Sequence, residues 1–129
     1  MPEHPNVALH RRGHEAFRNG DVEFLSGLFA EDTVWHWPGR SPVGGEFRGR
    51  DAVLALLAKF GEMVDSLEFV DEDFLASDTR TVSLSRIEAT RGGKTLAYDL
   101  CEVVRWEDGK VVEEWALVDD QYAYDEFWS

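Results

Sequence analysis

The 129-residue sequence predicts an α+β fold, in which a curved antiparallel sheet wraps around three N-terminal helices as a cone-shaped barrel with an internal pocket. Two observations predict it. Apolar residues before Ser66 recur with helical spacing, whereas those after it alternate every second residue. Helices and strands are therefore segregated along the chain, and a twisted sheet that closes over helices leaves a hollow. The length fits one domain, residues 1–129.

Two helices are expected first. Pro5 to Asn19 carries an apolar stripe that includes His10, His14 and Phe17. Asn19-Gly20 ends this helix, and Asp21 caps a second, short one. Ala30-Glu31-Asp32 is then expected to be a hinge into a short strand, Thr33 to Trp37.

A loop and a third helix follow. Pro38 to Gly45 is rich in glycine and proline and is interpreted as a loop. The third helix is expected from Ala52 to Val64. It is apolar almost all round, includes Phe60, and should be well buried.

The second half of the chain predicts four antiparallel strands in a meander. Asp78, Gly92-Gly93 and Asp108-Gly109 are the turns between them. The expected strands are Leu67–Leu75, Arg80–Thr90, Thr95–Trp106 and Lys110–Val118. The aromatic tail, Gln121 to Ser129, is expected to pack on the body of the domain.

Composition excludes several classes of function. The formal net charge is -13, from 26 acidic and 13 basic residues, so we expect no nucleic-acid partner and no anionic membrane partner. No apolar run is long enough to span a bilayer. The single cysteine, Cys101, allows no intramolecular disulfide, and the first residues show no signal peptide. A cytoplasmic location fits both observations.

Several short sequence segments resemble those of the nuclear-transport-factor-2-like superfamily, and within it the SnoaL-like polyketide cyclases and ketosteroid-isomerase-like proteins. They are Ala16-Phe17-Arg18-Asn19-Gly20-Asp21, Leu28-Phe29-Ala30-Glu31-Asp32, Pro38-Gly39 with Gly45 to Arg50, and Asp108-Gly109-Lys110-Val111. The resemblance covers nearly the whole chain. It implies the cone-shaped fold and a homodimer, but not one activity, because this fold hosts isomerases, cyclases, hydrolases, dehydratases and non-catalytic binders.

The resemblance argues against ketosteroid isomerase chemistry. That mechanism needs a carboxylate base and an oxyanion hole made of a tyrosine and a carboxylic acid. The family's tyrosine on the first helix aligns with Gly13, and its general base aligns with Trp37. Gly13 cannot supply the tyrosine hydroxyl, and Trp37 cannot act as the carboxylate base.

The resemblance to SnoaL-type cyclases implies an acid/base aspartate on the last strand. The spacing from Trp115 matches Asp119, and a slip of one residue would exchange it with Asp120. If one face of this strand lines the pocket, one of the two aspartates stands at its mouth or inside it. The alternative is that both aspartates only cap a turn in water. The predicted catalyst needs no cofactor and would remove a proton next to a carbonyl group, with His14, Arg86 or Tyr98 steadying the oxyanion.

The expected ligand is a small hydrophobic molecule. Trp35 and Trp37 share one face of the first strand and either stack on this ligand or pack in the core. His36 then faces the far side of the sheet, where relatives often dimerise, or lines the pocket if the strand is bulged. The remaining candidate pocket residues are His14, Phe17, Phe60, Tyr98 and Trp115.

His10 and His14 lie four residues apart on a helix, a spacing that can chelate a metal ion. No third ligand is identifiable in the sequence, because Glu15 lies off that face. We therefore expect no metal.

Two alternatives to the cyclase or isomerase remain. Arg86 and Glu88 share a strand face that is interpreted as the sheet interior. With Asp119 they resemble the arginine and two aspartates of limonene-epoxide hydrolases, although glutamate replaces one aspartate. A cross-strand ion pair is the simpler interpretation. The other alternative is a non-catalytic module for ligand binding or dimerisation, which a cavity filled by Phe17, Trp35 and Trp37 would favour.

Overall fold

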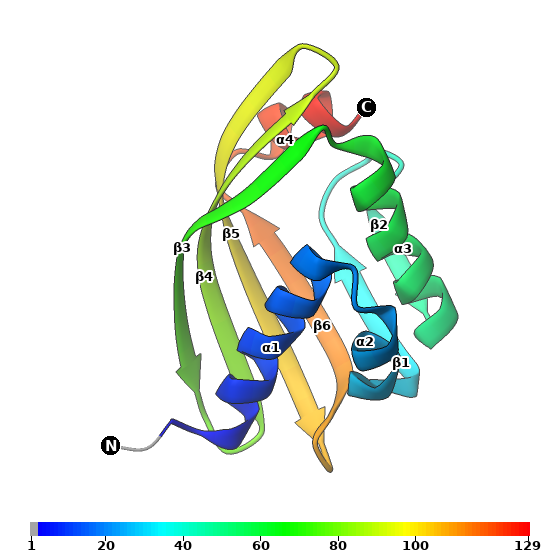
Figure 1. The fold of residues 1–129 in the computed structure, drawn as a ribbon, viewed down its shortest axis with the longest axis vertical. Coiled ribbons are helices and arrows are strands. Elements are labelled where there is room, and N and C mark those ends of the chain that lie inside the picture. Colours follow the sequence, from blue (N-terminus) through cyan, green and yellow to red (C-terminus); the bar gives the residue numbers. More distant parts are fainter. Residues whose placement is uncertain (1–2) are drawn as a thin grey trace.

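The computed structural model describes residues 3–129 and confirms the α+β fold, with helices lying against the concave face of one strongly curved sheet (Figure 1). The helices are α1 (Pro5–Asn19), α2 (Val22–Leu28), α3 (Arg50–Met63) and α4 (Gln121–Trp128). The strands are β1 (Phe29–Trp37), β2 (Gly45–Arg48), β3 (Ser66–Ala76), β4 (Arg80–Arg91), β5 (Lys94–Glu107) and β6 (Lys110–Val118). No helix of this described range is long and apolar enough to cross a membrane.

The sheet has the order β2-β1-β6-β5-β4-β3 and is not closed into a barrel. Four of its five pairings are antiparallel, and three of these form the expected meander of β3 to β6, but β1 runs parallel to β6. The sequence could not show this pairing. Alternation marks which face of a strand is buried but does not identify the neighbouring strand.

The helix boundaries follow from local capping. The side chain of Asp21 accepts a hydrogen bond from the backbone N–H of Phe24 and begins α2. Gly20, at φ 68°, ends α1, and its N–H bonds to the carbonyls of Ala16 and Phe17. The expected hinge at residues 30–32 is wrong, because β1 starts directly at Phe29. The expected loop ends in a short strand, β2.

The sheet and the helices enclose an aromatic core. Trp35 from β1 stacks on Trp37 and meets the edge of the Phe29 ring. The C-terminal tail forms α4, which begins where the Asp120 side chain accepts from the backbone N–H of Ala123. This helix buries Trp128 against Phe60 of α3, so the tail closes one end of the core, as the sequence predicts.

Candidate functional site

A cavity lies between the helices and the concave face of the sheet, and about 80 Å³ of it is free. A water molecule needs about 10–15 Å³ on a comparable measure, so the space suits several waters or part of a small organic molecule. Most of the wall is apolar and aromatic. Of the expected pocket residues, these line it: His14, Phe17, Trp35, Trp37, Phe60 and Tyr98. The cavity is thus not filled by Phe17 and the two tryptophans.

A second, open hollow of about 420 Å³ adjoins this cavity. It lies between α1, α2, α3 and the start of β3. It shares four lining residues with the inner cavity, namely Phe17, Leu25, Leu57 and Leu67. These four side chains lie between the two hollows, and we call them the mouth of the inner cavity.

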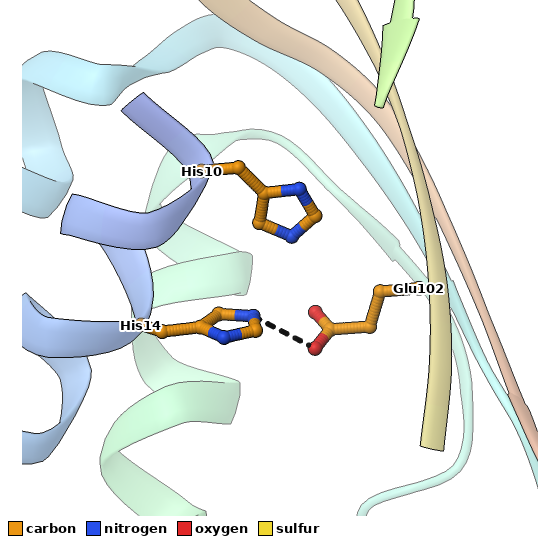
Figure 2. Close-up of side chains that lie close together, drawn as sticks. All are labelled: His10, His14 and Glu102. Carbon is orange, nitrogen blue, oxygen red and sulfur yellow. Dashed lines mark hydrogen bonds and ion pairs between the residues drawn. The ribbon is translucent and has the colours of Figure 1, made fainter. Parts of the chain in front are cut away.

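A cluster of buried ionisable groups forms one wall of the cavity. Helical spacing puts His10 and His14 on the same buried side of α1, and alternation along β5 turns Glu102 toward them (Figure 2). The Nε2 atom of His14 lies 3.1 Å from a carboxylate oxygen of Glu102. Glu114 of β6 is also buried and lines the same cavity.

Contacts between the residues of this cluster determine which of them are charged. Burial opposes a charge on His14, but the charge of Glu102 and hydrogen bonds to Glu102 and Glu72 outweigh it and raise the pKa of His14 to about 9. For Glu102, burial alone would raise the pKa, yet the charge and hydrogen bond of His14 hold it at about 2. His14 is therefore a cation and Glu102 an anion at neutral pH.

His10 and Glu114 stay neutral beside this ion pair. Burial, helped by the nearby His14 charge, lowers the pKa of His10 to about 4. Burial raises the pKa of Glu114 well above its ordinary value, and the charge of Glu102 raises it further. Neutral pH thus leaves a carboxylic acid and an uncharged imidazole on the cavity wall.

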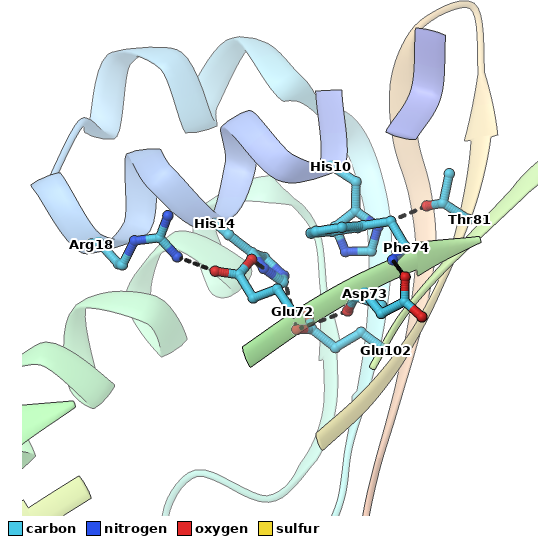
Figure 3. A network of polar contacts seen from close by, with 9 residues as sticks. His10, His14, Arg18, Glu72, Asp73, Phe74, Thr81 and Glu102 are labelled. Atoms are coloured by element: carbon cyan, nitrogen blue, oxygen red, sulfur yellow. Dashed lines mark hydrogen bonds and ion pairs between the residues drawn. The ribbon is translucent and has the colours of Figure 1, made fainter. Parts of the chain in front are cut away.

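Further contacts hold both imidazole rings in place. Glu72 of β3 lies 2.9 Å from Nδ1 of His14 and receives a 2.7 Å hydrogen bond from Arg18 (Figure 3). Nδ1 of His10 lies 2.8 Å from the Thr81 hydroxyl, which accepts from the Trp106 indole N–H at 2.9 Å. Each histidine therefore has its Nδ1 engaged and its Nε2 on the side of Glu102 or the cavity.

Three residues of the cavity wall carry a buried polar atom without a hydrogen-bond partner within residues 3–129. They are Nε2 of His10, Nε1 of Trp35 and Oε2 of Glu114. Buried polar groups are nearly always paired in folded proteins, so such atoms mark places where a bound molecule can supply the partner.

The aspartates of the last strand do not line this cavity, contrary to the prediction. The Asp119 side chain accepts from the backbone N–H of Asp99, lies 3.9 Å from the Arg86 guanidinium, and is 44% exposed. Asp120 caps α4. A bulge explains the difference, because β6 fits an extra residue between Val111 and Glu113 opposite β5. The bulge brings Val111 and Glu114 to the same inner face and leaves Trp115 and Asp119 outside.

Arg86 and Glu88 also lie on the outer face, so their assignment to the sheet interior is wrong. The inner face of β4 is instead formed by residues such as Ser85 and Ile87. Arg86 is 43% exposed and pairs with Asp99 at 3.1 Å, which is the cross-strand ion pair that the sequence also allows. The set of Arg86, Glu88 and Asp119 therefore faces away from the cavity.

Trp115, expected in the pocket, lies on the outer face. Its ring stacks on His36 at 5.6 Å between centroids. His36 bonds Glu113 at 2.7 Å, so this histidine faces the far side of the sheet, as expected.

The two positions that align with ketosteroid isomerase residues do face the cavity. Gly13 and Trp37 both line it. A Cβ at Gly13 would lie 3.1 Å from the Leu28 side chain, so a larger residue there requires Leu28 to move. The wall offers its ionisable groups elsewhere, at His10, His14, Glu102 and Glu114, and neither glutamate was predicted for this role from the sequence.

Comparison with known proteins agrees with this geometry. Residues 10–114 match the SnoaL-like domain family. The uncharacterized protein Rv0034 of Mycobacterium tuberculosis is 30% identical over 131 residues, covering 100% of both chains.

Solved structures share the whole fold. Bal32a, from a soil-derived mobile gene cassette, has a TM-score of 0.91 at 37% identity, covering 97% of both chains. An NTF2-like protein from Burkholderia xenovorans has a TM-score of 0.90 at 26% identity, covering 100% of this chain and 99% of the other.

More distant structures show the fold alone. TerC, co-crystallized with polyporic acid, has a TM-score of 0.83 at 22% identity and covers 96% of this chain and 98% of its own. IdmH from Streptomyces antibioticus, a proposed polyketide cyclase, has a TM-score of 0.76 at 21% identity and covers 90% and 93%. The family match, the full-length relative and the shared cone-shaped fold place this chain in the SnoaL-like family of the NTF2-like superfamily.

Proposed function

We propose that the chain binds a small, flat, hydrophobic molecule with a carbonyl group, and that it catalyses proton transfer next to that carbonyl as an isomerase or cyclase. One observation supports this above all. An otherwise apolar, aromatic cavity ends in a buried ion pair flanked by a neutral imidazole and a carboxylic acid. General acid–base catalysis needs a protonated group that gives up a proton and an unprotonated group that accepts one, and this wall carries both kinds.

Each unpartnered atom has a role in this proposal. The indole N–H of Trp35 is a hydrogen-bond donor for a carbonyl oxygen, which becomes more negative as the proton leaves carbon. Protonated Glu114, which also contacts Glu102, turns its O–H from Glu102 toward the same oxygen. The proton acceptor is Nε2 of His10, in the tautomer whose Nδ1–H donates to Thr81. His14, held as a cation by Glu102, favours the developing negative charge on the substrate.

The cavity walls suit an aromatic or conjugated ligand. Trp35 and Trp37 stack with their ring planes 17° apart, and such a pair presents a flat apolar surface. The co-crystallization of TerC with polyporic acid and the proposed cyclase role of IdmH are consistent with this class of ligand on the same fold. The acid/base residues differ from the aspartates that the sequence favoured, because the wall carries Glu102, Glu114, the two histidines and Tyr98 but neither aspartate.

The test is a panel of aromatic ketones and enones, offered to protein from which metal ions have been removed with a chelator. Binding is measured by calorimetry and turnover by absorbance. His10→Gln and Glu114→Gln should keep ligand binding within a few-fold, since both retain hydrogen-bonding groups, and should lower turnover by about 10²–10⁴-fold.

Asp119→Asn is the matched control and should leave turnover unchanged. Loss of turnover in Asp119→Asn alone would place the chemistry on the outer face and overturn the assignment. If the wild type binds a ligand tightly but does not turn it over, the catalytic part of the proposal fails and the protein is a non-catalytic binder. Failure of every ligand to bind would reject the ligand class.

A further inference from the structure

We propose that His10, His14 and Glu102 form a binding site for one divalent transition-metal ion, of the class that Zn²⁺ represents. One ligand atom from each residue lies within 4.8 Å of the others, and all three residues are buried (Figure 2). Two histidines and one carboxylate form a ligand set typical of catalytic zinc and non-haem iron. An ion on His14 takes the place of the Nε2 proton, which is released to solvent.

The orientation of both imidazole rings selects Nε2 as the ligand atom. Nδ1 of His14 is held by Glu72, and Nδ1 of His10 by Thr81. The Nε2 atom of His10 is buried without a partner among residues 3–129, and that of His14 lies beside Glu102. These two atoms and the carboxylate would bind an ion from one side. The other side of the ion would stay open to the cavity.

The contacts behind the rings form the outer shell that metal-binding histidines need. Such histidines almost always donate their other ring N–H to a carboxylate, a carbonyl or water, which fixes the ring orientation. Glu72 is a carboxylate in that position, and it is itself fixed by Arg18 (Figure 3). Thr81 is fixed by Trp106 in the same way. The two rings are therefore positioned from behind, independently of each other.

Ion binding requires a modest contraction. Ligand atoms about 2.1 Å from a tetrahedral zinc lie roughly 3.4 Å apart. The three ligand atoms lie within 4.8 Å of one another, so the widest pair must close by up to about 1.4 Å. Glu102 can supply this movement, because a glutamate has three rotatable side-chain bonds.

This site is independent of the proposed organic ligand, since its readout is ion binding alone. An ion would occupy the Nε2 lone pair that the metal-free mechanism assigns to His10. Zinc-loaded and metal-free protein would therefore be two chemically distinct forms, and the reaction test above uses the metal-free one.

The experiment titrates Zn²⁺ by calorimetry, and Co²⁺ by absorption, into chelator-treated protein that carries no polyhistidine tag. We expect one ion per chain. His10→Gln and Glu102→Gln should weaken Zn²⁺ binding by more than about 100-fold. Glu72→Gln, which removes only an outer partner, should weaken it by about 10–100-fold.

His36→Gln is the matched control, because His36 lies beside Glu46 and Glu113 on the outer face and could itself attract an ion. It should change the affinity less than threefold. NMR of the imidazole nitrogens gives a second readout that needs no variant, since Zn²⁺ should shift Nε2 of His10 and His14 most strongly. Absence of stoichiometric binding, retained affinity in both ligand variants, or loss of binding in His36→Gln would overturn the proposal.

Discussion

The Nε2 atom of His14 lies 3.1 Å from a carboxylate oxygen of Glu102, which joins α1 to β5 across the inside of the molecule. Both side chains are only 8% exposed. A second histidine–glutamate contact, between His36 and Glu113 at 2.7 Å, lies at the outer face, with side chains 34% and 25% exposed. The two pairs differ mainly in burial, so they form a matched comparison.

Glu102→Gln should destabilise the protein far more than Glu113→Gln. Removing Glu102 leaves the buried His14 cation with Glu72 as its remaining carboxylate partner, which costs up to about 3–5 kcal/mol, whereas a more exposed pair contributes about 0–1 kcal/mol. Denaturant unfolding of both variants measures the free energies of unfolding. The pKa of His14 should also fall in Glu102→Gln, which histidine NMR can follow. Equal losses in the two variants would contradict the buried ion pair.

Metal-free protein should lose stability as the pH rises from about 6.5 to 9. Folding raises the pKa of His14 from 6.5 to about 9, so its contribution is complete below 6.5 and disappears as the pH passes through the folded value. A shift of this size corresponds to about 3 kcal/mol. The raised pKa of Glu114 acts in the same direction, whereas His10, with its pKa lowered to about 4, acts only below this window.

The measurement is the free energy of unfolding at several pH values in the presence of a chelator. His14→Gln should remove the part of the decline between pH 6.5 and 9 that His14 supplies. His36→Gln, on the outer face, should retain it. A wild-type protein whose stability is flat across this range would show that His14 is not a buried cation.

Asp120→Ala should destabilise the C-terminal helix without touching the cavity wall. The Asp120 carboxylate caps α4 by accepting from the Ala123 N–H, and losing such a cap costs about 0.5–2 kcal/mol. The helix holds Tyr124 and Trp128 in the core, so near-UV circular dichroism should weaken together with the stability. Asp120→Asn keeps the capping oxygen and should behave like the wild type. A catalytic role for Asp120 would instead make both variants equally inactive on a substrate.

The sequence was sufficient for the fold because its two periodicities are long and continuous. The expected strand Lys110–Val118 is the observed β6, and the first helix ends where Asn19-Gly20 predicted. The site was harder, because a single bulge in β6 shifts its alternation and exchanges the inner and outer faces. Asp119 was favoured through its spacing from Trp115 in the resemblance to the cyclases, and Glu114 was overlooked.

The proposed metal site was not predicted from the sequence for a different reason. His10 and His14 showed the spacing, but their candidate third ligand, Glu102, comes from a strand 88 residues beyond His14. No local pattern predicts that contact. A glutamate in the middle of the apolar run Leu100-Cys101-Glu102-Val103-Val104 was the available signal, because a charged residue at an inward position of a strand is rarely buried without a function or a partner.

The last prediction concerns the mouth of the cavity, which is formed by Phe17, Leu25, Leu57 and Leu67. A ligand larger than the inner cavity must extend between these side chains. Leu57→Trp adds bulk at this position and should weaken binding of any ligand found in the ketone and enone panel by at least tenfold, mainly through slower association. The inner cavity and its ionisable wall should remain intact.

Ala58→Trp is the matched control, since Ala58 is the next residue of α3 and lines only the outer hollow. It should change ligand affinity less than threefold. Stopped-flow measurements that follow the absorbance of the ligand avoid interference from the added tryptophans. If Ala58→Trp slows association as much as Leu57→Trp does, the effect arises in the outer hollow rather than at the mouth. If neither variant slows it, the ligand reaches the His14–Glu102 wall by a different route, and the four shared residues are only part of the core.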